Sequence, residues 1–269
     1  MIPRNIFQLT TNNIRINDQI YSNIRFLKDK NPNWNYELLD EARQIEFLTL
    51  HAPKYLKIYE KFGKGYDVAK MDFFRYVLVY ECGGLYLDLK CSFTEPLDEF
   101  INQKERFLVS HWPNNPESFY TNWGKHPELS KKGEFINGVI ISEARNPVLL
   151  DVIHSIVKNI ENYSPFRNGV GGPAVLRLTG PVAYTLAIEH SPFRETIKEI
   201  DFFAHGLRVS IFENDKTHMS LYRLHYGKRV NPVIKKSIIH DYIVSTLFLI
   251  KKVTALLIKK MHKLIKSKV

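Results

Sequence analysis

Residues 67–88 constrain the fold of this chain more than any other stretch. Residues 67–81 are apolar on most sides, which is typical of a helix that is buried over most of its surface. A pair of glycines then ends the helix and lets the backbone turn within two residues. A short apolar strand is predicted over residues 85–87, and it ends at Asp88. A buried helix joined this tightly to a buried strand indicates a sheet with helices packed on it.

The remaining sequence alternates between strand-like and helix-like segments. Strands are predicted over residues 4–9, 36–39, 107–110, 139–142 and 207–211. Helices are predicted over residues 18–27, 147–162 and 181–189, with a helix–loop–helix unit over residues 41–62. This alternation favours an α/β fold, and a length of 269 residues fits one large domain.

Cysteine usage and apolar runs suggest the compartment. The two cysteines, Cys82 and Cys91, are too few for a disulfide framework, and we expect both to be reduced and buried. The first residues lack the long apolar run that follows a basic region in a secretory signal. Nowhere does an apolar run approach the roughly 18 residues of a membrane-spanning helix. These features predict a cytoplasmic protein.

The positive charge is concentrated near the C-terminus. The formal net charge is +10, and residues 240–269 contain seven lysines and one acid, Asp241, which gives +6 and leaves +4 for the rest of the chain. The basicity is therefore weak support for a nucleic-acid groove on the body. A basic nucleic-acid-binding module remains a rival function with this segment as its contact, but we predict no nucleic-acid partner.

Residues 240–269 also have the pattern of an amphipathic helix. Apolar residues recur at spacings of three, four or seven, while most of the lysines fall elsewhere on the helix. The apolar positions are Ile243, Leu247, Ile250, Leu257, Met261 and Leu264. Each lysine near anionic lipid contributes about 1 kcal/mol, so the helix could hold the protein at a membrane surface. The alternative is a helix docked on the body with a solvated lysine face. We predict the membrane-surface role, on the inner face of the plasma membrane.

Three charged residues in the first stretch are candidates for chemistry. Ligands of open α/β sheets lie beyond the carboxyl ends of strands, where Asp88 is predicted. A carboxylate there can hold a ribose hydroxyl or a divalent ion that bridges a diphosphate, although many strands end in an Asp that only caps a turn. Asp72 and Arg75 lie three residues apart on the same face of the buried helix. Buried charges must be paired or functional, so they form either a structural salt bridge or part of a binding site.

Two of these stretches carry a family resemblance: AKMDFFRY over residues 69–76 and GGLYLD over residues 83–88. Together they resemble the glycosyltransferase family with a DXD-containing sugar-binding region, which includes yeast initiating mannosyltransferases and bacterial capsular polysaccharide transferases. They are more distantly similar to the glucosylating domains of large clostridial toxins. Stretches that agree with the family in the same order are IPRNIFQ (2–8), NPNWNYELLD (31–40), FING (135–138) and TGP (179–181). The resemblance is closest from residue 2 to about residue 100 and thinner beyond.

The resemblance implies both a fold and an activity. The fold is a single GT-A-like domain over residues 1–239, with a mixed, mostly parallel sheet flanked by helices and followed by the basic helix of residues 240–269. The activity is that of a retaining glycosyltransferase that moves a hexose from a nucleotide-sugar donor to a saccharide or lipid-linked acceptor in surface polysaccharide synthesis. A catalytically inactive sugar-binding homologue is the alternative within the family.

The resemblance also implies roles for individual residues. Asp72 and Arg75 would hold hydroxyls of the donor sugar, and Asp88 would contact the ribose or the metal shell. The other implied donor-binding residues are Phe7 and Gln8 beside the nucleotide, Tyr86 at the nucleotide and Asn137 near the sugar.

The sequence departs from the family motif at Lys90. The family's pair of carboxylates is Asp-x-Asp, whereas this chain has Asp88-Leu89-Lys90. A protonated lysine has no lone pair for a metal ion, but its ammonium can offset the charge of a diphosphate leaving group. The predicted catalytic site therefore either uses Lys90 without metal, or holds a divalent cation (Mn²⁺ or Mg²⁺) through Asp88 and a C-terminal group. Candidates for that group are Asp215, His218 and, as the preferred match, His225.

Trp112 and Trp123 border a polar segment that contains two prolines. Aromatic faces stack on sugars, so this segment could be a loop that faces the acceptor. An ordinary surface loop anchored by tryptophans is the alternative.

Overall fold

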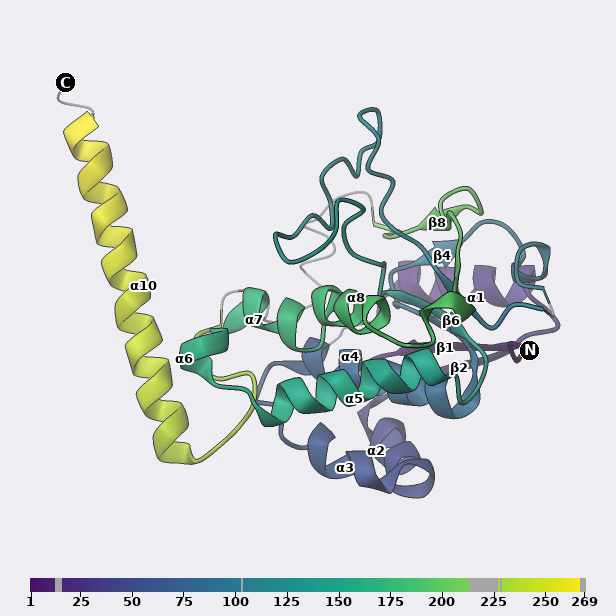
Figure 1. Cartoon of the computed structure of the whole chain (residues 1–269), viewed down its shortest axis with the longest axis horizontal. Coiled ribbons are helices and arrows are strands. Elements are labelled where there is room, and N and C mark those ends of the chain that lie inside the picture. Colours follow the sequence, from purple (N-terminus) through teal and green to yellow (C-terminus); the bar gives the residue numbers. More distant parts are fainter. Residues whose placement is uncertain (13–15, 103, 213–226, 228, 267–269) are drawn as a thin grey trace.

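The computed structural model describes residues 1–12, 16–102, 104–212, 227 and 229–266. Its centre is a six-stranded sheet in the order β2-β1-β3-β6-β5-β7 (Figure 1). The strands are β1 (Asn5–Leu9), β2 (Asn35–Leu39), β3 (Gly84–Leu87), β5 (Phe107–Val109), β6 (Val139–Ser142) and β7 (Lys198–Glu199). β1 is parallel to β2 and β3, and β5 is parallel to β7, whereas β6 is antiparallel to β3 and β5. The predicted mixed, mostly parallel sheet is confirmed.

A second, two-stranded sheet pairs β4 (Ser92–Phe93) with β8 (Leu207–Arg208) in antiparallel orientation. The strand predicted over residues 207–211 is thus present only at its first two residues, and it belongs to this small sheet.

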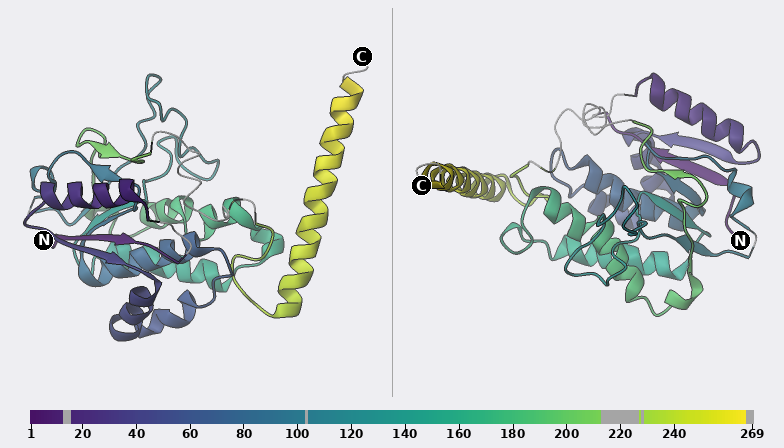
Figure 2. Two further views of the ribbon diagram at one scale, coloured as in Figure 1. Left: turned by 180° about the vertical axis from the view of Figure 1, so that it is seen from behind. Right: turned by 90° about the horizontal axis from the view of Figure 1, so that it is seen from above.

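Helices cover both faces of the main sheet (Figures 1 and 2). α1 (Asp18–Lys30) lies on one face, and α4 (Asp67–Cys82) and α5 (Pro147–Glu161) lie on the other. The shorter helices are α2 (Glu41–His51), α3 (Pro53–Tyr59), α6 (Pro165–Asn168), α7 (Gly171–Leu178) and α8 (Pro181–Glu189), with single 3₁₀ turns η1 (Leu97–Glu99) and η2 (Arg194–Thr196).

The alternation of side chains along β3 divides the core in two. Leu85 and Leu87 pack on the α1 side together with Leu27, whereas Tyr86 packs on the α4 side. α4 lies between the sheet, α3 and α5, and it is therefore buried on most sides, as predicted. Gly83 ends α4 with a φ of +65°, and a Cβ there would lie 2.6 Å from the backbone nitrogen of Ala144. Only glycine fits this turn, which places the end of β3 next to α4.

The C-terminal helix α10 (Ile238–Lys266) projects away from the body (Figures 1 and 2). Val244 is buried, but most of the other apolar side chains of this helix are exposed. The exposed ones are Ile238, Ile239, Tyr242, Ile243, Leu247, Leu249, Ile250, Val253, Leu256, Leu257, Ile258 and Met261. Within the described ranges, no helix is long and apolar enough to cross a membrane. The predicted C-terminal helix is confirmed, and its apolar face is not docked on the body.

Candidate active site

A pocket of about 300 Å³ opens at the carboxyl ends of the central strands. Leu9 at the end of β1 and Asp88 directly after β3 line it, together with residues of α4, α7 and the start of α8. The predicted site residues in its wall are Asp72, Arg75, Tyr86, Asp88, Lys90 and Asn137. The fold therefore brings residues from three separate sequence motifs into one pocket, at the edge where ligands of α/β sheets bind.

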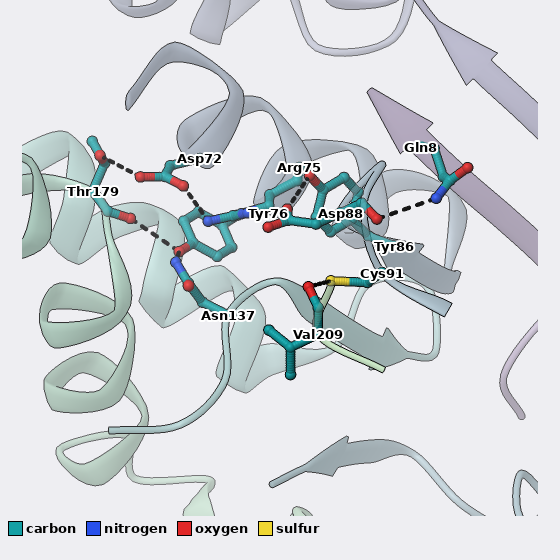
Figure 3. A network of polar contacts seen from close by, with 10 residues as sticks. All are labelled: Gln8, Asp72, Arg75, Tyr76, Tyr86, Asp88, Cys91, Asn137, Thr179 and Val209. Carbon is teal, nitrogen blue, oxygen red and sulfur yellow. Dashed lines mark hydrogen bonds and ion pairs between the residues drawn. The ribbon is translucent and has the colours of Figure 1, made fainter. Parts of the chain in front are cut away.

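Asp72 and Arg75 form a buried ion pair at the wall of this pocket (Figure 3). They are 4% and 5% exposed, and the Nη2 of Arg75 donates to Oδ1 of Asp72. The Thr179 hydroxyl donates to the other carboxylate oxygen, Oδ2, at 3.0 Å. Both oxygens of Asp72 are thus engaged by protein donors, which offsets the cost of burying its charge. Among the described residues, Nε of Arg75 has no hydrogen-bond partner.

Arg75 also binds the carboxylate of Asp88, through the terminal nitrogen that does not contact Asp72. Nη1 of Arg75 donates to Oδ1 of Asp88 at 2.9 Å, and the Tyr86 hydroxyl donates to the same oxygen at 2.8 Å (Figure 3). Oδ2 of Asp88 accepts no hydrogen bond from the described residues, and a Cβ at Gly138 would lie 3.0 Å from it. The Asp88 side chain is 32% exposed, so Oδ2 is the oxygen that can face a ligand.

The backbone on either side of Asp88 fixes that position. The amide nitrogen of Asp88 donates to the carbonyl of Gly138 at 2.8 Å, and the Gln8 side chain donates to the carbonyl of Asp88 at 3.2 Å. The first of these bonds continues the pairing of β3 with β6, and it brings Asn137, the residue before Gly138, into the same pocket as Asp88.

Burial and neighbouring charges set the protonation of the pocket. Burial raises the pKa of the Asp72 carboxyl, while Arg75 and Thr179 act against that rise. Burial lowers the pKa of Arg75, but Asp72 and other neighbours more than reverse this, and its pKa lies well above the ordinary value. Burial, and then Asp88, raise the pKa of Tyr86 well above that of a free tyrosine. At neutral pH, Arg75 is therefore a cation and Tyr86 a neutral hydrogen-bond donor.

Asn137 enters the pocket just before β6 and is oriented by a chain of hydrogen bonds (Figure 3). Its Nδ2 donates to the hydroxyl of Tyr76 at 2.9 Å, and that hydroxyl donates to the carbonyl of Thr179 at 2.9 Å. Because the amide nitrogen is held in this way, the amide carbonyl of Asn137 is left to accept from a ligand hydroxyl.

The described residues of the pocket do not by themselves fit a divalent cation. Oδ2 of Asp88 is the one free carboxylate oxygen that they supply, because Asp72 is engaged at both of its oxygens. No three His, Cys, Asp or Glu side chains in the described part of the chain are grouped so as to hold a metal ion. Lys90 lines the pocket at the position where the family has its second carboxylate. The predicted metal partners Asp215, His218 and His225 lie outside the described residues.

Phe7 and Gln8 were predicted beside the nucleotide, and neither lines this pocket. Phe7 is 4% exposed and lines a separate pocket toward α2, because it points to the opposite side of the strand from Gln8. Gln8 is fully buried, and its amide oxygen accepts from the Tyr36 hydroxyl at 2.8 Å while its amide nitrogen holds the backbone of Asp88. Their contact with a nucleotide stays a prediction, and the structure gives Gln8 the role of supporting Asp88.

The sequence did not single out two residues that the structure places here, Thr179 and Tyr76. Tyr76 and Thr179 both lie in stretches that resemble the family. A buried Asp72 needs a hydrogen-bond donor, and this requirement could have pointed to Thr179. Trp112, which the sequence placed at the edge of a possible acceptor-facing loop, lines the pocket from the loop after β5. No sequence pattern indicated that this loop reaches the pocket.

Comparison with known proteins gives a family match for about a third of the chain, in its N-terminal half. Residues 17–108 match the model of the glycosyltransferase sugar-binding region containing a DXD motif. An initiation-specific alpha-1,6-mannosyltransferase of Candida albicans is 26% identical over 174 residues, which is 57% of this chain and 42% of that protein. Inositol phosphoceramide mannosyltransferase 3 of Schizosaccharomyces pombe is 24% identical over 201 residues, which is 74% of this chain and 48% of that protein. The chain thus spans less than half the length of these curated relatives.

Solved structures give the same fold at low sequence identity. The glycosyltransferase domain of the YGT toxin, in its UDP-bound form, aligns with a TM-score of 0.50 at 10% identity and covers 74% of this chain and 79% of its own. Its ligand-free form aligns with the same TM-score at 11% identity, covering 74% and 80%. The predicted GT-A-like fold is confirmed.

Proposed function

We propose that this chain, whose residues 17–108 match the glycosyltransferase sugar-binding region containing a DXD motif, transfers a hexose from a nucleotide-sugar donor to a saccharide or lipid-linked acceptor. One observation carries the proposal. Six residues predicted from separate motifs line one pocket at the carboxyl ends of β1 and β3. Mannose is the first hexose to test, because the relatives are named as mannosyltransferases.

The geometry of each pocket residue supports a part in the proposed transfer. Asn137 and the Asp72–Arg75 pair supply an amide carbonyl and a fixed cation for donor-sugar hydroxyls. Asp88 presents Oδ2 to the ribose or to the diphosphate shell. In the transfer, the acceptor oxygen bonds to the anomeric carbon and the bond from that carbon to the diphosphate oxygen breaks, while the proton of the acceptor hydroxyl passes to the departing diphosphate or to solvent. We propose that the configuration at this carbon is retained, as the family resemblance implies.

The departing nucleoside diphosphate gains negative charge, which a positive group must stabilise. Lys90 lines the pocket and could supply this positive charge through its ammonium. A divalent cation would supply the same stabilisation if residues beyond the described ranges complete its coordination with Asp88. The proposal is that a positive charge beside Asp88 stabilises the diphosphate. Chelation combined with a Lys90 variant distinguishes a lysine from a metal ion as its source.

A donor screen tests the function directly. Purified protein is incubated with common UDP- and GDP-sugars, with and without manganese, and release of nucleoside diphosphate is measured. The same screen is run on the Asp88→Asn variant, for which we expect much lower release. We expect release from at least one donor, and NMR of the product should show the donor's anomeric configuration. Binding of nucleotides without any release would identify an inactive sugar-binding homologue instead.

We also propose that α10 holds the protein at an anionic membrane surface, and a position on the inner face of the plasma membrane remains a prediction. The exposed apolar residues of α10 and its lysines support this, because apolar burial and attraction to anionic lipid act together in such helices. Flotation with vesicles of phosphatidylcholine, with and without about 30% phosphatidylserine, is the test. Equal flotation with both compositions, or binding to oligonucleotides at physiological salt, would contradict it.

A further inference from the structure

The loop between β5 and β6 is closed at its base and leaves the sheet beside the pocket. His111 and Phe135 form an isolated antiparallel bridge, and the amide of Ile136 donates to the carbonyl of Ser110 at 2.9 Å. Residues 112–134 therefore form an excursion whose two ends are fixed on the main sheet.

The first residue of this loop, Trp112, is held rigidly. Its Nε1 donates to Oε1 of Glu134 at 2.9 Å, and His126 lies 2.8 Å from the other carboxylate oxygen. The Glu134 side chain is only 10% exposed, so both contacts are shielded from water. Gly124 packs against the same ring, since a Cβ there would lie 2.5 Å from Trp112. The indole is thus fixed before any ligand arrives.

An aromatic cluster extends outward from this ring, and we define it as Trp112, Phe119, Tyr120 and Trp123. The ring centroids of Trp112 lie 5.3 Å from Tyr120 and 5.1 Å from Trp123, and Phe119 lies 5.3 Å from Tyr120. Phe119 is 83% exposed and Trp123 is 43% exposed. Trp112 packs against the core and Tyr120 contacts Phe203 at 5.0 Å between ring centroids, so these two rings anchor the cluster. Exposing Phe119 and Trp123 forfeits the gain from burying such large rings, so core packing does not explain these two.

The cluster is continuous with the donor pocket, because Trp112 belongs to both. Trp112 lines the pocket together with Asp88 and Lys90, whereas Phe119 and Trp123 extend the aromatic surface away from it. A molecule that delivers a hydroxyl to the anomeric carbon must approach this pocket from outside, and the aromatic cluster borders that approach.

We propose that this aromatic cluster is the acceptor subsite and that its occupant is a pyranose ring of a saccharide acceptor. The inference rests on the proposed glycosyl transfer. The composition of the loop favours a sugar over a lipid: residues 113–128 contain no Leu, Ile, Val or Met, and Asn and Thr side chains accompany the aromatic rings. Flat aromatic faces take the apolar face of a pyranose, and amides and hydroxyls match its hydroxyl groups. The exposed aliphatic surface of the chain lies elsewhere, on α10.

The test uses Trp123→Ala and Phe119→Ala in the full chain, with Phe193→Ala as the control. Phe193 has the same 43% exposure as Trp123 but lies outside the cluster, in the turn after α8. Saturation-transfer NMR with mannobiose, cellobiose and lactose measures saccharide binding without turnover, and transfer to the bound probe is measured with the active donor. We expect each cluster variant to raise the acceptor KM or Kd about 3- to 10-fold and the control to leave it unchanged. Trp123→Phe should recover part of the affinity.

The outcomes separate this inference from the proposed function. Absence of donor turnover, with saccharide binding that the cluster variants weaken, would refute the transferase proposal and leave the subsite intact. Unchanged acceptor binding in both cluster variants, or no saccharide binding by the wild type, would overturn the subsite. The subsite would also be overturned if the cluster variants lost acceptor-independent donor hydrolysis as strongly as they lost transfer, because they would then act on the donor pocket.

Discussion

Replacing Asp88 by Asn tests the centre of the proposed site with the smallest possible change. An asparagine keeps an oxygen that can accept from Arg75 Nη1 and from the Tyr86 hydroxyl, which now lie at 2.9 and 2.8 Å from Oδ1. The substitution therefore preserves shape and hydrogen bonding, and it removes one negative charge from the pocket.

The expected effect on stability is small. The Asp88 side chain is 32% exposed, and partly exposed ion pairs contribute about 0–1 kcal/mol. Arg75 keeps its other partner, Asp72, so no buried charge is left unpaired. A change of about 1 kcal/mol or less corresponds to a melting-temperature shift of about 2–4 °C for a chain of this size.

The expected effect on turnover is large. A hydrogen bond to a charged group contributes about 1.5–3 kcal/mol, and each 1.36 kcal/mol is about tenfold in rate. Loss of one such contact to the donor predicts at least a 10- to 150-fold lower kcat/KM. The assay is nucleoside diphosphate release, measured beside thermal unfolding. Asp98→Asn is the matched control, because Asp98 is also paired with an arginine, Arg4, at 3.2 Å and lies outside the pocket. Turnover of Asp88→Asn within about twofold of wild type would refute the assignment of the site.

Four further outcomes are expected. Arg75→Lys should lose at least about tenfold in turnover, because one ammonium cannot reproduce two separate contacts, whereas a purely structural bridge to Asp72 predicts lower thermal stability with turnover retained at low temperature. If Lys90 stabilises the diphosphate, turnover of Lys90→Ala should fall about 100-fold, and turnover of the wild type should survive EDTA. If a metal ion has this role instead, EDTA should abolish turnover, manganese should restore it, and Lys90→Ala should have only a mild effect. Removal of residues 238–269 should leave an active enzyme on a water-soluble acceptor that no longer floats with anionic vesicles, and aggregation or unfolding of the truncated chain would place the helix in the core. Burial raises the pKa of Cys82 to about 11, so its alkylation at pH 7.5 should be about 100-fold slower than that of an ordinary thiol. The rate of alkylation, followed by mass spectrometry, should rise about tenfold per pH unit.

The fold was predictable where a periodic apolar pattern met a turn signal. The helix of residues 67–81 and the strand of residues 85–87 appear within a residue of their predicted ends, because glycine is required at position 83. The short helices α6 and α7 were missed, since α6 spans only Pro165–Asn168 and such a length carries no periodicity. The strand of residues 207–211 was overextended, because only its first two residues find a partner strand.

The site was predictable as a set of motifs but not as a geometry. The spacing of Asp72 and Arg75 placed them on one helical face, and the family resemblance added Asn137 from a distant segment. No sequence pattern indicated that a single guanidinium joins Asp72 to Asp88, because that contact depends on how α4 packs against the end of β3. The side of the strand that Phe7 faces was likewise set by sheet register.

The charges that line the pocket account for the departure at Lys90. Among the described residues that line the pocket, the charged ones are the carboxylates Asp72 and Asp88, the guanidinium Arg75 and the ammonium Lys90, and their formal charges cancel. With the family's aspartate at position 90 the same wall would carry a formal charge of −2, and a divalent cation would be needed to cancel it. The change from Asp to Lys alters the charge by the amount that such a cation supplies. A diphosphate leaving group therefore meets a comparable field in either arrangement, although Lys90 delivers it as a point charge without the geometry of metal coordination. The residue at position 90 is thus compatible with the proposed transfer, and the Lys90→Ala variant, measured with and without EDTA, tests whether this lysine supplies the charge.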